Sequence, residues 1–92
     1  MSKKARVHIF ISGLVQGVYF RQNTKRKAMD ADVMGWIKNL PDGRVETVFE
    51  GDSEKIKAMI KWVGQGPKNA RVQDVKINQE EHKGEFKKFK VM

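Results

Sequence analysis

The chain has 92 residues and a formal net charge of +8, from 19 Lys and Arg against 11 Asp and Glu. This length is that of one small domain with a single modest core. Hydrophobic residues make up 39% of the chain, which is too many for a disordered protein, whereas the apolar runs are too short to cross a membrane. Cysteine is absent, which excludes disulfides and a thiol nucleophile.

The basic excess attracts anions such as nucleic acid, acidic membrane or phosphorylated metabolites, and charge alone does not choose among them. An ordinary solvated, lysine-rich surface explains it equally well. The N-terminal segment MSKKARVHIF lacks the apolar stretch and cleavage site of a signal peptide. We therefore expect a cytoplasmic protein, with residues 1–5 as a loose N-terminal tail.

In chain order, the first element is expected to be a half-buried strand over residues 6–13, where Val7, Ile9 and Ile11 alternate with residues of the opposite face. A glycine-containing turn follows. Small residues at helical spacing then predict a helix over residues 22–31. Strands are expected over residues 34–39 and 44–51, joined by the turn segment LPDG.

The clearest helix begins after an N-cap at Asp52 or Ser53. Its apolar positions follow the i, i+3, i+4, i+7 pattern and are Ile56, Met59, Ile60 and Val63. Gly64 is expected to cap its C-terminus, and Pro67 prevents its continuation.

A last main strand is expected over residues 71–78, where Val72 is out of phase and indicates a bulge or an edge position. A short extra C-terminal strand could use Phe86, Phe89 or Val91 to seal an edge. The order βαββαβ predicts an α+β, ferredoxin-like sandwich, a four-stranded antiparallel sheet with two helices on one face. We expect residues 1–92 to form this single domain.

Two segments carry residues suited to chemistry. In GLVQGVYFR, Gly13 and Gly17 lie between a strand and a helix, where backbone N–H groups can converge on an anion, and Arg21 can bind two phosphate oxygens at once. In GWIKNLPDGRVE, Asn39 ends a strand with a carboxamide able to position a water. Taken separately, a glycine turn with a solvent-facing arginine, and an asparagine at a turn boundary, explain both segments structurally.

Other catalytic patterns are missing from the sequence. His8 and His82 are the only histidines, and we expect both to be structural or solvated. Their placement lacks metal-ligand spacing, and the sequence contains neither a P-loop nor a nucleophile-elbow motif. We therefore expect no bound metal and no cofactor.

Together, the two segments resemble the signatures of the acylphosphatase family, G-x-V-Q-G-V-x-[FY]-R and G-[FYW]-x-x-N-x-x-x-G-x-V followed by a further glycine. The first is matched by Gly13, Val15, Gln16, Gly17, Val18, Phe20 and Arg21. The second is matched by Gly35, Trp36, Asn39, Gly43, Val45 and Gly51. The resemblance covers essentially the whole chain. It departs after the first helix, where relatives usually carry a Leu-Gly pair and Ala31 lacks the conformational freedom of glycine.

The resemblance implies hydrolysis of acyl phosphates to a carboxylate and inorganic phosphate. Arg21 would grip the phosphoryl group, and Asn39 would hold the attacking water. The phosphate-binding backbone amides would be those of Gln16, Gly17, Val18, Tyr19, Phe20 and Arg21. The expected partners are then a small-molecule acyl phosphate and inorganic phosphate, the latter as product and competitive inhibitor.

We expect a monomer that binds neither nucleic acid nor membrane. The alternative is a non-enzymatic ferredoxin-like module that binds RNA or senses a ligand, because the fold hosts many functions. RNA-recognition motifs share this strand order, but their aromatic strand signature is absent from RVETVFEG.

Overall fold

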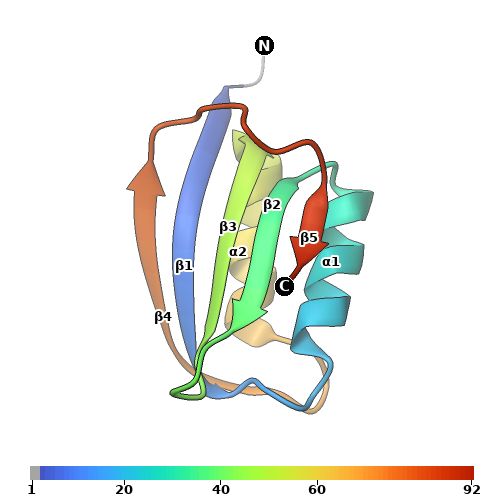
Figure 1. Ribbon diagram of the computed structural model, residues 1–92, viewed down its shortest axis with the longest axis vertical. Helices are drawn as coiled ribbons and strands as arrows, with labels where there is room; N and C mark the ends of the chain where they lie inside the picture. Colours follow the sequence, from blue (N-terminus) through green and yellow to red (C-terminus); the bar gives the residue numbers. More distant parts are fainter. Residues whose placement is uncertain (1–2) are drawn as a thin grey trace.

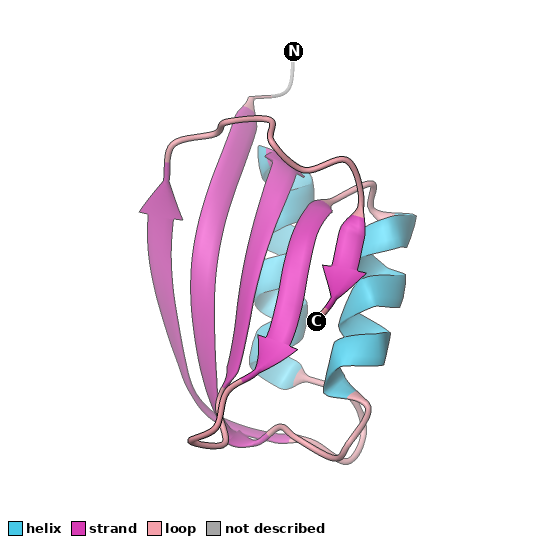
Figure 2. Ribbon diagram, viewed as in Figure 1, coloured by secondary structure: helices cyan, strands magenta, loops and turns pink. Residues whose placement is uncertain are grey.

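The structure is a computed structural model that describes residues 3–92. Its elements are β1 (Lys4–Leu14), α1 (Phe20–Asp30), β2 (Met34–Asn39), β3 (Val45–Asp52), α2 (Ser53–Gln65), β4 (Arg71–Glu80) and β5 (Phe89–Val91). The strands form one sheet in the order β4-β1-β3-β2-β5 (Figure 1). Both helices cover the same face of this sheet (Figure 2), which confirms the predicted ferredoxin-like arrangement. Within residues 3–92, no helix has the length and apolar character needed to cross a membrane.

The first four strands pair antiparallel, as predicted, and the short C-terminal strand is present as a fifth. β5 pairs parallel with β2, in a register that places Phe89 opposite Gly35, so the complete sheet is mixed. Phe89 is buried, and its ring centroid lies 5.8 Å from that of Phe49 in the centre of the sheet. This strand therefore seals the β2 edge with an aromatic side chain.

The β4 edge contains a bulge. Ser12 pairs with Asp74 and Gly13 with Val72, so Gln73 has no partner in the β1 ladder. Val72 breaks the alternation of this strand, for which a bulge or an edge position was the predicted explanation. Both apply, since Val72 lies beside a bulge and on an edge strand. A Cβ atom at position 13 would lie 2.1 Å from the Arg71 carbonyl oxygen, so this close approach of β1 and β4 requires glycine.

The first strand begins earlier than its alternation predicts. Lys4 and Ala5, expected in a loose tail over residues 1–5, pair instead with Asp52 and Gly51 of β3. The Ser53 amide also donates a hydrogen bond to the Lys3 carbonyl oxygen. Because β3 runs on to Asp52, it supplies backbone partners that the apolar pattern does not signal. The rest of the predicted tail, residues 1 and 2, lies outside the described residues.

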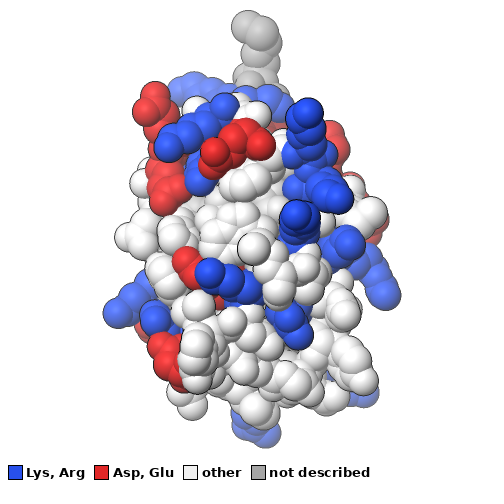
Figure 3. Space-filling view, viewed as in Figure 1, with Lys and Arg blue, Asp and Glu red and all other residues white. Residues whose placement is uncertain are grey.

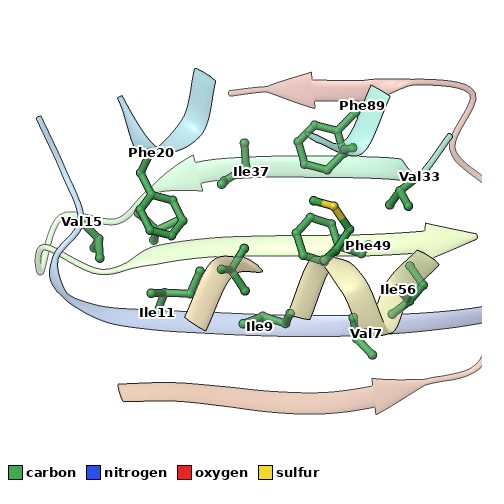
Figure 4. Packing of buried hydrophobic residues seen from close by; sticks show 14 residues of the cluster. Val7, Ile9, Ile11, Val15, Phe20, Val33, Ile37, Phe49, Ile56 and Phe89 are labelled. Carbon is green, nitrogen blue, oxygen red and sulfur yellow. The ribbon is translucent and has the colours of Figure 1, made fainter. Parts of the chain in front are cut away.

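The core lies between the sheet and the two helices, with side chains from every layer (Figure 4). Val7, Ile9 and Ile11 point into it from β1, as their alternation predicts. Val15 and Phe20 extend it toward the end of the molecule where β1 passes into α1 (Figure 4). The loop between these two residues is thus held by buried side chains at both ends.

The helix ends differ in detail from those predicted. Asp52 caps α2 by accepting a hydrogen bond from the Glu54 amide. The C-cap is Gly66, with φ of 73°, and not Gly64, because the helix continues to Gln65. After α1, Asp32 takes the left-handed conformation with φ of 57°, whereas Ala31, the C-cap residue, has φ of −91° and does not need the freedom of glycine.

Candidate active site

The loop over residues 15–19 connects β1 to α1 and is shaped by two left-handed residues. Gly17 has φ of 75° and Tyr19 has φ of 61°. Gln16, which precedes Gly17, and Val18, which lies between the two, do not have positive φ. Such alternation turns successive backbone N–H groups toward the same side and forms a concave anion-binding surface. Gly13, expected to share this task with Gly17, belongs to β1 and serves the contact with β4 instead.

The loop leads directly into the N-terminus of α1. Tyr19 is the N-cap residue, no side chain within the described chain caps this end, and the first turn has no acidic residue. The first backbone N–H groups of a helix have no partners within it and carry partial positive charge. This helix end therefore adds hydrogen-bond donors and positive potential to those of the loop.

Arg21 lies in the first turn of α1 and is half-buried. Its Nη1 donates a hydrogen bond to the main-chain oxygen of Met92, at 3.0 Å. No Asp or Glu side chain of residues 3–92 forms an ion pair with it. One corner of the guanidinium is thus held by the segment after β5.

Asn39 is the last residue of β2, opposite Val45 of β3. Its Oδ1 is buried and, alone among the buried side-chain polar atoms of residues 3–92, has no hydrogen-bond partner. A buried acceptor without a partner costs free energy, on the order of 1–3 kcal/mol, and is therefore rare outside functional sites. Asn39 thus presents an acceptor suited to a hydrogen-bond donor such as water.

The turn after Asn39 is stabilised locally. The Leu40 amide donates to the Arg44 carbonyl oxygen, and the Gly43 amide donates to that of Leu40. Asp42 accepts hydrogen bonds from the backbone amide and from Nε of Arg44, and these bonds hold the pKa of the Asp42 carboxyl below its usual value. The end of β2 is therefore held by a compact hairpin.

Gln16 connects this hairpin to the loop before α1. Its Nε2 donates to the carbonyl oxygens of Leu40, at 2.8 Å, and Arg44, at 3.0 Å. One side chain thus links the segment that carries the converging amides to the turn that follows Asn39. Its side chain is committed to this link, so any part of Gln16 in anion binding must come from its backbone.

A pocket of about 320 Å³ joins these features. It is lined by Val15, Gly17, Tyr19, Phe20, Arg21, Gln22 and Asn39. Among the residues expected to act, Arg21 and Asn39 therefore share one cavity although they come from different elements. Gln16 and Val18 do not line it.

The histidines lie elsewhere. On the sheet face opposite the helices, His8 Nε2 is 2.6 Å from Glu46 Oε2, while His82 lies in the exposed segment after β4. No group of three His, Cys, Asp or Glu residues suited to a metal ion occurs among residues 3–92.

Two sets of hydrogen bonds that shape the site were not predicted from the sequence. The contact of Arg21 with Met92 spans 71 positions of the chain, and no periodicity or motif marks it. The side-chain role of Gln16 was also missed, although its place in the first signature could have drawn attention to it.

Comparison with known proteins identifies the family of this chain. A family model described as Acylphosphatase matches residues 7–91. A curated acylphosphatase from Syntrophus aciditrophicus is 46% identical over 87 residues, which span 95% of this chain and 91% of the relative. One from Pyrobaculum aerophilum is 48% identical over 89 residues, spanning 96% and 94% of the two chains. The solved structure of an acylphosphatase from Coxiella burnetii has a TM-score of 0.91 and 34% identity, over 97% of this chain and 93% of that one. Matched along almost its whole length by these relatives, the chain belongs to the acylphosphatase family.

Proposed function

We propose that this chain hydrolyses the carboxyl–phosphate bond of acyl phosphates, with Arg21 and Asn39 as its catalytic residues. The observation that carries the proposal is their shared pocket. Its lining brings together Arg21, which has no Asp or Glu partner among residues 3–92, the left-handed loop residues Gly17 and Tyr19, and Asn39, whose buried Oδ1 has no hydrogen-bond partner.

The phosphoryl group would bind to the guanidinium of Arg21 and to the backbone amides of residues 16–21. A planar guanidinium binds two phosphate oxygens at once, and a helix N-terminus favours negative charge. The alternating backbone conformation at Gly17 and Tyr19 supports this role, because it orients the amides before any ligand arrives. Preorganised donors of this kind stabilise the charge of the transition state.

The attacking water would donate a hydrogen bond to Oδ1 of Asn39. Its oxygen forms a bond to phosphorus while the bond from phosphorus to the acyl oxygen breaks in line, and the electron pair leaves with the carboxylate. The proton of the water passes to a phosphate oxygen of the substrate, since no side chain that lines the pocket is a good base. The products are a carboxylate and inorganic phosphate.

This reaction does not need a general acid. The leaving carboxylate has a conjugate acid with a pKa of about 4, so it departs at neutral pH without a proton. The placement of both histidines outside the pocket is compatible with such chemistry. Catalysis then consists of positioning and charge stabilisation.

Benzoyl phosphate hydrolysis tests the activity, and two variants test the assigned roles. Arg21→Ala is expected to abolish phosphate binding and turnover, because the loss of such a donor costs about 3–4 kcal/mol or more. Asn39→Ala is expected to lose turnover but to keep competitive inhibition by inorganic phosphate. Arg26→Ala and Asn78→Ala, at exposed positions outside the pocket, are matched controls. Equal loss of phosphate affinity in both site variants would contradict the roles.

The alternative of a non-enzymatic RNA-binding or ligand-sensing module is not favoured by these comparisons. RNA-recognition motifs bind RNA on the exposed face of their sheet. On this face of the molecule, which Figure 3 shows, acidic side chains lie among the basic ones. Here Glu46 contacts His8 and Lys38, and Glu80 contacts Arg6.

A monomeric state, a cytoplasmic location and the absence of nucleic-acid binding stay predictions. Light scattering, cell fractionation and titration with RNA at physiological salt test them directly.

A further inference from the structure

Tyr19 combines two unfavourable properties. Its backbone is left-handed, with φ of 61° and ψ of 27°, and its side chain is 75% exposed. A residue with a Cβ atom is strained in this region, where glycine or asparagine is common. The exposed ring also gains little from packing. Neither property is explained by stability, and backbone strain of this kind occurs preferentially at functional sites.

The position is not one that the family signature defines. In G-x-V-Q-G-V-x-[FY]-R, Tyr19 occupies the variable place between Val18 and Phe20. Its backbone amide serves the phosphate loop in the proposed function, but that role is independent of the side chain. The signature therefore leaves the side chain at this position open.

Tyr19 lines two depressions. One is the pocket shared by Arg21 and Asn39. The other is a groove of about 300 Å³, which is lined by Val18, Tyr19, Asn23, Trp62, Pro67, Lys68 and Asn69. Tyr19 is the residue common to both, and Asn39 does not line the groove. Each volume is within the range of small-ligand sites, which begins at roughly 300 Å³.

The groove has a definite chemical character. Val18, Trp62 and Pro67 supply apolar surface beside the polar residues Asn23 and Asn69, and the Trp62 ring centroid lies 5.8 Å from that of Phe20. Lys68 is its only charged lining residue, is exposed, and makes no ion pair within residues 3–92. The groove therefore suits an apolar or flat group that ends in a negative charge.

We propose that this groove binds the acyl part of the substrate, with Tyr19 as the specificity-determining side chain. The inference rests on the proposed function. In-line displacement places the acyl leaving group on the side of phosphorus away from the attacking water, and so away from Asn39. The groove continues from the phosphate pocket at Tyr19 without reaching Asn39. The favoured substrate class is acyl phosphates with an aromatic or extended apolar acyl group and a second anionic group that reaches Lys68.

The test compares kcat/KM for acetyl phosphate, benzoyl phosphate and 4-carboxybenzoyl phosphate, because kcat/KM reports binding to the transition state. Tyr19→Asn removes the ring but tolerates the left-handed backbone, whereas Tyr19→Phe keeps the ring. We expect the benzoyl-to-acetyl ratio to fall about twofold to tenfold in Tyr19→Asn, as for loss of one aromatic contact, and to persist in Tyr19→Phe. Using the ratio cancels any general damage to the phosphate loop.

Lys68→Gln tests the charged end of the groove. It is expected to lower the preference for 4-carboxybenzoyl over benzoyl phosphate about twofold to fivefold, with a smaller effect at high salt. Lys61→Gln, which removes an exposed lysine outside the groove, is the matched control. Turnover of all three substrates with unchanged ratios in Tyr19→Asn and Lys68→Gln overturns this inference alone. Absence of turnover on every acyl phosphate overturns the proposed function as well.

Discussion

The link between the phosphate loop and the β2–β3 hairpin can be broken at Gln16. Its amide nitrogen makes two hydrogen bonds to main-chain carbonyl oxygens, those of Leu40 and Arg44. Gln16→Met has similar size and removes both bonds. Gln16→Glu has the same shape but faces both carbonyl oxygens with a carboxylate. The backbone amide of residue 16 is retained in both variants.

The expected magnitudes follow from the remaining partners. Each carbonyl also accepts a backbone hydrogen bond, from Gly43 and Leu40 respectively, so neither is left without a donor in Gln16→Met. Each hydrogen bond contributes about 1 kcal/mol net, so Gln16→Met should lower the free energy of unfolding by about 2 kcal/mol, which corresponds to roughly 10 °C in Tm for a domain of this size. At pH 7, Gln16→Glu should lower the free energy of unfolding by about 1–3 kcal/mol more than Gln16→Met does, because its partly buried carboxylate faces no hydrogen-bond donor.

Urea denaturation at pH 7 and pH 5 measures the order of stability, wild type above Gln16→Met above Gln16→Glu. Lowering the pH should narrow the gap between the two variants, since a protonated carboxyl can donate one hydrogen bond. Both variants should lose kcat by about tenfold or more, because small displacements of positioned groups are costly, while affinity for inorganic phosphate changes less. A Gln16→Glu protein as stable as wild type at pH 7, with unchanged kcat, would refute the reasoning.

Three further predictions concern stability and cofactors. Asp32→Gly relieves a left-handed non-glycine residue and should raise the free energy of unfolding by about 0.5–1 kcal/mol without altering kcat, as urea denaturation and assay can show; a loss of stability contradicts it. Burial raises the pKa of the Glu50 carboxyl, but hydrogen bonds from the Lys83 and Gly84 amides outweigh it, and the folded pKa lies below the usual 4.5. Glu50 thus stabilises the fold above that pH, and the contribution is lost as the pH falls through the lowered value. Arg6 lies 3.5 Å from Glu50 and also donates a hydrogen bond to Glu80 that lowers the pKa of the Glu80 carboxyl, so Arg6→Met should flatten the fall in stability between pH 5 and pH 3, and an unchanged profile argues against both pairings. Activity should survive EDTA, and a loss that added metal restores would show that a metal is required.

The strand and helix pattern was predictable because most elements have one buried face. The residues of β2 were predicted without error, since alternation and the LPDG turn both delimit this strand. Helix ends were less predictable, because several small or polar residues in a row can serve as the cap. Gly66 and Asp32 take the left-handed positions, whereas sequence reasoning considered Gly64 and Ala31.

The site was predictable only as far as local motifs reach. Arg21 and Asn39 share a pocket because two signatures lie at the ends of neighbouring elements of the fold. Their fine placement depends on contacts between distant parts of the chain, such as those of Gln16 with Leu40 and Arg21 with Met92. Hydrogen bonds of this kind leave no periodic trace, so only the folded structure reveals them.

The parallel strand β5 also affects how the protein is made. Both signatures leave the ribosome before residues 89–92, yet Arg21 obtains its main-chain partner only when residues 89–92 dock beside β2. The Met92 amide then completes the edge by donating to the Ile37 carbonyl oxygen. Closing the long loop between residue 21 and residue 92 costs entropy, which the contacts of β5 must offset. In a refolding experiment, enzymatic activity should therefore report the docking of residues 89–92 beside β2.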